Sequence, residues 1–318
     1  MGGDFRPLTK FLLPVDMNES FRRPAALTGN MAGVLGDRVE RVTFLHVMGG
    51  RYLGEHMKNI DVRADFVLET DLFKRLRQQY IEKEIRPLLE EAQGTLTSCG
   101  CKAPSDLEVR DGKPVKEIIR FSTEGSYSTI IIERRGLSSL HRALFGSVSA
   151  GLLHSNVAAT IYLVGSEAAA AKHAPVRRCL LALDGSIPSE AAAGEAAVLL
   201  GGCREGLETV ILLHVIGADR YAEQVAAGQC PVDKDVQSVF ELPKRGLLES
   251  GVPESIIQED VRRGENPADL IVEEVEKAGC DMVFMGRQGR SALKELFMGS
   301  VSQGVINKTS KPTIALTK

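Results

Sequence analysis

The sequence contains no long hydrophobic run and no strong excess of charge. No segment of its 318 residues approaches the ~20 continuous apolar residues of a membrane-spanning helix. Residues 1–16 show no basic region followed by a long apolar core and a cleavage site, so we expect no signal peptide. The formal net charge of −3 gives no electrostatic reason to expect nucleic acid as a partner. These absences predict a cytoplasmic globular protein without membrane or nucleic-acid partners.

Paired C-x-x-C motifs and the common catalytic signatures are also missing. Cys99 and Cys101, separated by one glycine, could form a redox or metal pair, but two ligands alone do not make a zinc site. We expect reduced thiols and no metal site. The sequence has no P-loop, nucleophile elbow, H-E-x-x-H motif or kinase signature set, and therefore offers no positive case for catalytic turnover. The remaining cysteines are Cys179, Cys203, Cys230 and Cys280.

What the sequence does contain is an internal repeat, which is the first feature to look for because it decides the fold. The matched blocks keep their order, and the offset between them is constant at first and then shortens. We therefore place a longer middle in the first copy, around residues 50–80. The matched pairs are FLLPVD (11–16) with CLLALD (179–184), TFLHV (43–47) with ILLHV (211–215), and LFGSVS (144–149) with LFMGSVS (296–302).

Short apolar runs alternate with helical patterns in each copy. Strands that are apolar almost throughout, alternating with helices, predict a parallel sheet covered on both faces. We expect an α/β protein with two tandem, doubly wound, parallel five-stranded sheets, each a Rossmann-like α/β/α sandwich. In the second copy the expected strands are Arg178–Asp184, Thr209–Ile216, Ser255–Val261, Asp281–Met285 and Pro312–Leu316, and the expected helices are Ser189–Leu200, Asp233–Ser250, Ala268–Ala278 and Ser300–Lys308. The first copy repeats this order from Lys10–Asp16 to Thr160–Val164.

A segment of small residues closed by Pro175 separates the copies and is typical of a linker. We place the first domain at 1–165, the linker at 166–176 and the second domain at 177–318. Because unpaired edge strands need covering, we expect the two copies to pack together at their last strands, about a pseudo-twofold axis. The sequence leaves further homodimerisation open.

A glycine-rich loop follows the fourth predicted strand of the second copy. It reads Met285-Gly-Arg-Gln-Gly289 and, after nine residues, continues with Gly299-Ser300-Val301. Glycines let the backbone approach a ligand, and a helix N-terminus favours an anion. A phosphate cradle and a plain turn with Ser300 as N-cap explain this composition equally well. If the strand order is 3-2-1-4-5, Asp184 and this loop face one crevice.

At this loop the resemblance to a known family becomes specific. Each copy resembles a universal stress protein domain, and Gly286-x2-Gly289-x9-Gly299-Ser300 is similar to that family's ATP-binding motif at every fixed position. The resemblance covers nearly the whole chain outside the linker and implies bound ATP, with or without Mg²⁺. It implies that Asp184 contacts the nucleoside and that the backbone of Val215 meets adenine. The residues implied to line the ribose and phosphates are Met285, Gly286, Gly289, Gly299, Ser300 and Val301.

Charged residues near the two loops differ between the copies. Glu133 of the first copy replaces Gly286, and its carboxylate would repel phosphates by about 1 kcal/mol or more at ~5 Å. Arg134 and Arg135 could offset that charge or fill the site; we expect weak or absent ATP binding in the first copy. In the second copy Arg287 is our candidate for a phosphate contact, with solvation as the alternative, and we give Arg290 and Lys294 less weight.

His46 and His214 recur at the end of the second strand of each copy. A general base is conceivable, but no second catalytic group recurs with them, so we expect a structural role. Asp184 has an alternative role in holding its turn. The resemblance thus implies an ATP-binding protein of stress response or signalling, with nucleotide mainly in the second copy. A slow ATP hydrolase or nucleotide-transferring enzyme, and a nucleotide-free scaffold, are the alternatives.

Overall fold

The computed structural model describes most of both halves of the chain. No helix within these residues is long and apolar enough to cross a membrane. Most of the expected linker lies outside them, as do Arg135, Gly136, Cys230, Arg290 and Lys294. The described residues are 6–17, 21–49, 71–134, 146–166, 175–203, 206–217, 235–289 and 298–318.

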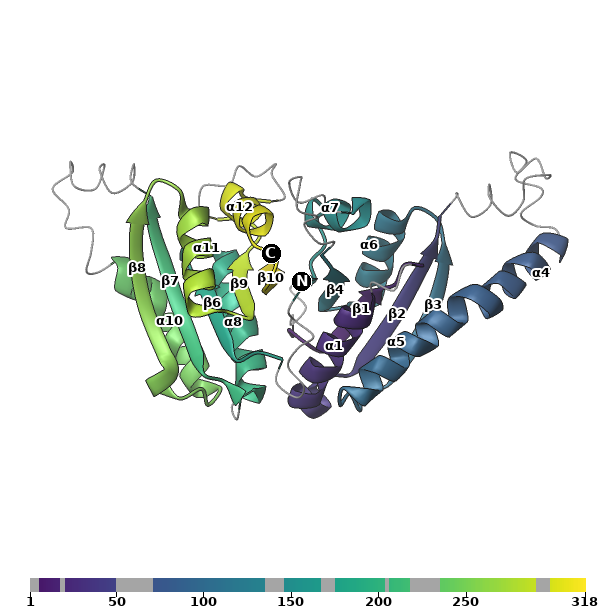
Figure 1. Cartoon of the computed structure of the whole chain (residues 1–318), viewed down its shortest axis with the longest axis horizontal. Coiled ribbons are helices and arrows are strands. Elements are labelled where there is room, and N and C mark those ends of the chain that lie inside the picture. The colour runs from purple at the N-terminus through teal and green to yellow at the C-terminus, as the bar shows by residue number, and fades with distance from the viewer. Residues whose placement is uncertain are drawn as a thin grey trace.

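Within the described ranges, ten strands form one sheet, in the order β3-β2-β1-β4-β5-β10-β9-β6-β7-β8. Each half contributes five parallel strands in the order 3-2-1-4-5, which confirms the predicted doubly wound fold. Figure 1 shows the halves side by side, with β4 and β10 near the middle and β3 and β8 at the outer edges. The strands are β1 (Lys10–Pro14), β2 (Arg41–Met48), β3 (Ser105–Asp111), β4 (Thr129–Glu133), β5 (Thr160–Val164), β6 (Arg178–Ala182), β7 (Thr209–Gly217), β8 (Ile257–Gly264), β9 (Met282–Gly286) and β10 (Thr313–Thr317).

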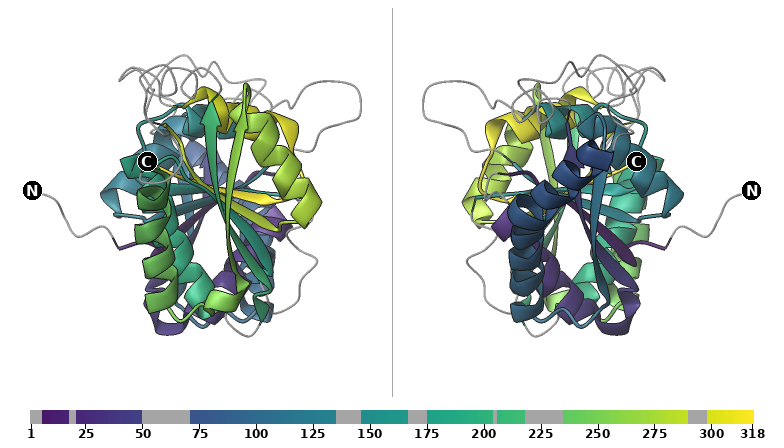
Figure 2. Two further views of the ribbon diagram at one scale, coloured as in Figure 1. Left: turned by 90° about the vertical axis from the view of Figure 1, so that its left-hand side faces the viewer. Right: turned by 90° about the vertical axis from the view of Figure 1, so that its right-hand side faces the viewer.

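Helices cover both faces of the sheet because its inner strands are apolar on both sides. Every residue of β9 and β10 is buried, whereas the edge strand β8 alternates between half-buried and exposed positions. At each outer end of the sheet, one long helix lies on either face, as α10 and α11 do around β7 and β8 (Figure 2). The helices are α1 (Arg22–Leu35), α4 (Asp71–Tyr80), α5 (Arg86–Ser98), α6 (Pro114–Glu124), α7 (Ser147–Leu153), α8 (Ile187–Gly202), α10 (Asp235–Glu249), α11 (Pro267–Ala278) and α12 (Ser300–Lys308).

Two hydrophobic cores follow from this layering, and each runs through both halves. One contains buried side chains of α1, α5, α8 and α10 beneath one face of the sheet. The other contains those of α6, α7, α11 and α12 beneath the opposite face. The cores therefore continue across the junction between the halves, as the sheet does.

The longer middle of the first half is helical in the part that the structure describes. α4 continues through a π-helical segment, Ile81–Ile85, into α5, so the chain is helical from Asp71 to Ser98. The counterpart in the second half, α10, has 15 residues. The rest of the expected insertion, residues 50–70, lies outside the described part.

Several predicted strand boundaries differ from the structure by one to three residues, and two of these differences have a clear local reason. β6 ends at Ala182 instead of Asp184, because the chain turns there through Gly185, whose φ of 69° lies in the left-handed region. The third strand begins at Ile257 instead of Ser255, after a 3₁₀ turn at Glu254–Ile256. The predicted bounds of α12 and β5 agree with the structure.

The two halves meet at their last strands. β5 and β10 pair antiparallel, with Tyr162 opposite Ala315, and the Ser166 amide extends the contact by donating to the Ser310 carbonyl at 3.0 Å. On one face of this junction, α8 approaches α1 very closely: a Cβ at Gly202 would lie 2.7 Å from the Val34 carbonyl oxygen. Each half thus covers the edge strand that the other would leave unpaired.

Candidate functional site

The turn after β6 fixes the position of Asp184. The Ser186 amide and hydroxyl both donate to Asp184 Oδ1, at 3.0 Å and 2.6 Å. Ser186 Oγ in turn accepts a hydrogen bond from the Ser189 amide at 3.3 Å and so caps α8. Asp184 is therefore held at the carboxyl end of the sheet by the start of the next helix.

The first part of the glycine loop lies directly against this turn. A Cβ at Gly286 would lie 2.7 Å from the Pro188 Cβ, which is closer than real Cβ contacts come. A Cβ at Gly289 would lie 2.7 Å from Asp184 Oδ2. Glycine at both positions therefore allows the loop to close against the start of α8 and against Asp184.

The second part of the loop leads into α12 and is tied back to the first part. The Gly299 amide donates to the Arg287 carbonyl at 2.7 Å, and Ser302 Oγ donates to the Gly286 carbonyl at 2.8 Å. The first intrahelical bond of α12 joins the Gln303 amide to the Gly299 carbonyl at 3.0 Å. The amides of Ser300 and Val301 therefore belong to the first turn of the helix, where backbone donors have no intrahelical acceptor.

This geometry decides between two interpretations of Ser300. Gly299 is the N-cap residue of α12, and Ser300 is its exposed first helical residue. Ser300 therefore does not act as the N-cap. Sequence reasoning overlooked the linking role of Ser302, although its recurrence at Ser149 in the other copy would have drawn attention to it.

The remaining expected residues lie along neighbouring strands of the same edge. Met285 is buried in β9 and pairs with Ala182 of β6 on one side and Leu316 of β10 on the other. Val215 is half-buried near the end of β7, on the other side of β6. The structure thus brings Asp184, Gly286, Gly289, Gly299, Ser300 and Val301 close together beyond the carboxyl ends of β6 and β9, at the place of the expected crevice. Met285 lies within β9, and Val215 lies near the end of β7.

The recurring histidines have a structural position in both halves. His46 Nδ1 bonds the Val15 carbonyl at 2.8 Å, and His214 Nδ1 bonds the Leu183 carbonyl at 2.7 Å. Both imidazoles therefore tie the end of the second strand to the turn after the first. Burial lowers the pKa of His46, against the opposing effects of its hydrogen bond to Val15 and of Asp16 nearby. The neutral imidazole suits this fixed role.

Arg287 has a different place from the one expected for a phosphate ligand. Its side chain is 1% exposed, and Nη2 donates to the carbonyls of Val157 and Ala159 in the first half, at 2.6 Å and 2.9 Å. The guanidinium thus points into the junction between the halves and away from the crevice. Only its backbone belongs to the loop. The sequence could not show this, because the acceptors lie about 130 positions away in the chain.

The corresponding crevice of the first half is a cavity of about 150 Å³. Glu133 lies at its edge, and its carboxylate is paired with Arg23 of α1, whose Nε donates to Oε1 at 2.6 Å. Arg134, expected near this carboxylate, instead reaches the Ile306 carbonyl in the second half. Arg23 is therefore the residue that offsets Glu133. The cavity is lined by Pro14, Val15, Asp16, Pro24, Leu45, His46, Val47, Pro114, Ile118, Ile132, Glu133, Gly146, Ser147, Val148 and Ser149.

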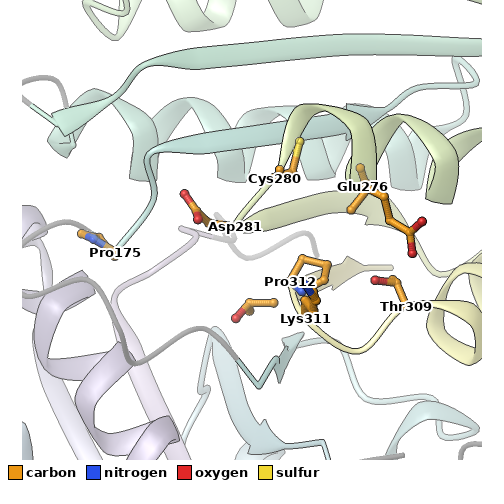
Figure 3. A pocket seen from close by; sticks show the side chains of 10 residues that line it. Pro175, Glu276, Cys280, Asp281, Thr309, Lys311 and Pro312 are labelled. Carbon is orange, nitrogen blue, oxygen red and sulfur yellow. The ribbon is translucent and has the colours of Figure 1, made fainter.

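A larger cavity, of about 330 Å³, lies at the opposite end of the second-half strands (Figure 3). The Asp281 carboxylate beside it accepts hydrogen bonds from the amides of Arg177 and Arg178, at 2.8 Å and 2.9 Å. Burial raises the pKa of the Cys280 thiol to about 12, so it is not a nucleophile at neutral pH. The described residues that line this cavity do not include a glycine-rich loop followed by a helix N-terminus, which is the arrangement expected to bind phosphate. Its lining is Pro175, Val275, Glu276, Gly279, Cys280, Asp281, Thr309, Lys311, Pro312 and Thr313.

The cysteines in the part of the chain that the structure describes are unpaired thiols. Five cysteines there are free, and four of them are buried. Cys99 and Cys101 are among these free thiols. Within the described ranges, no three histidine, cysteine or acidic side chains are grouped so that they could hold a metal ion.

Fold and site together define a doubly wound α/β protein with a glycine-rich loop at the point where the strand order reverses. The model of the universal stress protein family matches residues 64–157 and 175–316, and the chain belongs to this family. A universal stress protein of Mycolicibacterium smegmatis is 26% identical over 245 residues, covering 74% of this chain and 77% of that protein. One of Methanocaldococcus jannaschii is 32% identical over 126 residues, covering 35% of this chain and 78% of that protein.

The fold is similar to a solved structure along its whole length. A universal stress protein of Archaeoglobus fulgidus has a TM-score of 0.65 and 24% identity, covering 98% of this chain and 97% of that one. At this level of identity the similarity concerns the fold. It extends over both halves of the present chain.

Proposed function

We propose that the chain binds ATP in the crevice of its second half. The observation that carries the proposal is the contact between Gly289 and Asp184, in which a Cβ added at Gly289 would lie 2.7 Å from Oδ2, directly beside the first turn of α12. The contact puts a carboxylate that can accept from ribose hydroxyls next to backbone donors that favour phosphate. Family membership supports the choice of an adenine nucleotide as ligand.

The family resemblance and the positions of these residues support a role for each of them. Asp184 is proposed to accept a hydrogen bond from the ribose, and the backbone of Val215 to meet the adenine ring. The amides of Ser300 and Val301, together with the positive end of the α12 dipole, are proposed to bind phosphate oxygens. Met285, Gly286, Gly289 and Gly299 shape the surface on which the ribose and phosphates rest. Arg287 enters this site only through its backbone.

The first half is proposed to bind ATP weakly or not at all. Glu133 stands where the second half has Gly286, and its carboxylate is only 11% exposed. Its pairing with Arg23 supports this proposal, because the ion pair occupies the first-half position that corresponds to Gly286. Replacing one partner of such a half-buried pair leaves the other uncompensated, so the pair resists displacement by a ligand.

The nucleotide released from freshly purified, denatured protein is the most direct test. We expect about one ATP or ADP per chain in preparations to which no nucleotide was added. Saturation binding should then give one strong site. Two sites of similar affinity would contradict the asymmetry between the halves. A chain that neither carries nor takes up adenine nucleotide would contradict the proposal and favour a nucleotide-free scaffold.

We also propose a cytoplasmic role in stress response or signalling, in which ATP selects one conformation of the paired halves. A ligand that binds only the folded state raises the free energy of unfolding by mass action. The antiparallel β5–β10 pair supports stable pairing within one chain, since it covers the last strand of each half, which would be an exposed edge in a lone half. Sedimentation of the apo and ATP-bound chain tests whether further dimerisation accompanies binding.

A further inference from the structure

Two arginines at matching positions cross the junction between the halves. Arg134 follows β4 and Arg287 follows β9, so each directly continues the strand that leads into its glycine loop. Their side chains are 3% and 1% exposed, although arginine is rarely buried to this extent in folded proteins. Each side chain leaves its own half and bonds backbone carbonyls of the other.

The two contacts are reciprocal. Arg287 donates to the carbonyls of Val157 and Ala159, in the segment between α7 and β5 of the first half. Arg134 donates to the carbonyl of Ile306, in the last turn of α12 of the second half. Arg134 therefore holds α12 itself, and Arg287 holds the segment that directly follows α7. These two helices are the ones that begin after the glycine loops.

As a result α12 is held at both ends. At its N-terminus the Arg287 carbonyl accepts from the Gly299 amide at 2.7 Å. At its C-terminus the Arg134 guanidinium holds Ile306. The Arg287 amide also donates to the Thr317 carbonyl of β10, at 2.7 Å. A ligand that shifts the first turn of α12 therefore acts on residues that are bonded to the other half.

The route continues to the cavity of the first half. Val157 and Ala159, which Arg287 holds, follow α7 by a few residues. The first turn of α7 contributes Ser147, Val148 and Ser149 to the wall of that cavity. A change in the hydrogen bonds of Arg287 is therefore transmitted to the first-half cavity through a short stretch of backbone.

Maximal stability does not explain these arginines. Burial lowers the pKa of each guanidinium to about 10, which leaves both cationic at neutral pH. Among the residues that the structure describes, none accepts a hydrogen bond from Arg134 Nε, Arg134 Nη1 or Arg287 Nε. Buried donors without a partner cost free energy, and apolar residues of similar volume often replace buried charges without loss of stability. A role in linking the two halves explains why two arginines are buried here at a cost in free energy.

We propose that Arg134 and Arg287 are positioning residues that couple occupancy of the second-half loop to the pairing of the two halves. The inference rests on the nucleotide site proposed above and concerns its regulation. Nucleotide binding tightens the β5–β10 contact, and by thermodynamic reciprocity the paired state binds nucleotide more tightly by the same factor. The coupling passes through α12, which is packed in the core and hydrogen-bonded near its N-terminus to Arg287 and near its C-terminus to Arg134.

Hydrogen exchange of the full chain, with and without saturating ATP, tests the coupling. In the wild type we expect ATP to slow exchange of the β5 and β10 amides about fivefold or more. Arg287→Met should still bind ATP, with affinity reduced by a similar factor, and should lose most of this protection. Arg134→Met should behave likewise. The matched control is Arg245→Met, on the exposed face of α10, which should respond as the wild type does.

The outcomes separate the two proposals. If the wild type binds no nucleotide, the proposed function fails and the coupling fails with it. If ATP binds but protects β5 and β10 equally in the wild type and both methionine variants, the coupling alone is overturned. Arg287→Lys covers the case in which Arg287→Met does not fold. Lysine retains the positive charge but has one donor nitrogen where arginine has three. We therefore expect ATP to slow exchange of the β5 and β10 amides only partly in this variant.

Discussion

Asp184 Oδ2 lies 2.7 Å from the position that a Cβ atom would occupy at residue 289. The turn after β6 and the loop after β9 are therefore in direct contact. Their contact requires glycine at position 289, because any larger side chain there would collide with the Asp184 carboxylate. It also means that a small change at residue 289 displaces the carboxylate proposed to meet the ribose.

Gly289→Ala should lower ATP affinity by at least tenfold while the fold is retained. The added methyl group pushes the Asp184 carboxylate away, and Gly289 itself is exposed, so little else has to move. Isothermal titration and thermal unfolding measure the two effects. Gly194→Ala is the control, because a Cβ there meets nothing within 4 Å; it should bind ATP normally and gain about 0.5–1 kcal/mol. Unchanged affinity of Gly289→Ala would show that the site is misplaced.

Glu133→Gly should create a second nucleotide site. The substitution removes a carboxylate from the edge of the first-half cavity and releases Arg23, which is then available to a phosphate. Saturation binding should rise from about one to about two nucleotides per chain. Glu124→Ala, at an exposed position of α6, is the control and should leave the stoichiometry at one. A stoichiometry of one in both variants would mean that Glu133 does not keep ATP out of the first half.

Asp184→Ala should weaken ATP binding and slightly destabilise the second half. The change removes the acceptor of two hydrogen bonds from Ser186, and the loss of such a turn costs about 1 kcal/mol. With labelled ATP we expect no steady ADP release from either the wild type or the variant. Steady release from the wild type that Asp184→Ala abolishes would favour the ATP hydrolase instead.

Glu195 should make the stability of the chain depend on pH. It lies on α8, and its carboxyl group accepts hydrogen bonds from Thr160 and Tyr162 of β5, at 2.6 Å and 2.9 Å. Burial raises the pKa of Glu195 to about 7, although these two hydrogen bonds and, more weakly, Arg38 act in the opposite direction. The folded state therefore retains this proton at a pH at which an unfolded chain would lose it.

The sign follows from proton linkage. The contribution to stability is complete below the ordinary carboxyl pKa of 4.5 and is lost as pH rises through about 7. Over that window the free energy of unfolding should fall by about 3 kcal/mol, on the order of 1.4 kcal/mol per unit of pKa shift. Urea unfolding at pH 5, 6, 7 and 8 measures it. Glu195→Gln should flatten the profile, whereas Glu190→Gln, exposed on the same helix, should not.

The local pattern of residues was sufficient to predict the elements and their order. Buried strands such as β4 and β9 are short runs of Ile, Val, Met and Phe, and that composition alone indicates a sheet covered on both faces. The glycine spacing likewise predicted that Gly286, Gly289 and Gly299 lie between the fourth strand and the last helix of the second half. Chain connectivity fixes this, because β9 leads through the loop into α12. The domain boundaries at 1–165 and 177–318 stay a prediction.

Tertiary structure decided what the charged side chains do. Arg287 was the candidate for a phosphate contact and Arg134 was expected to act near Glu133, but the acceptors of both side chains belong to the opposite half. Glu133 finds its partner in Arg23, 110 positions earlier in the chain. A long side chain bonds whatever the packing of distant segments brings within reach, and no local pattern records that. The sequence by itself determined the repeat, the alternation of strands and helices, and the loop. The docking of the halves determined which arginine pairs with Glu133 at the first-half cavity and which arginines cross the junction.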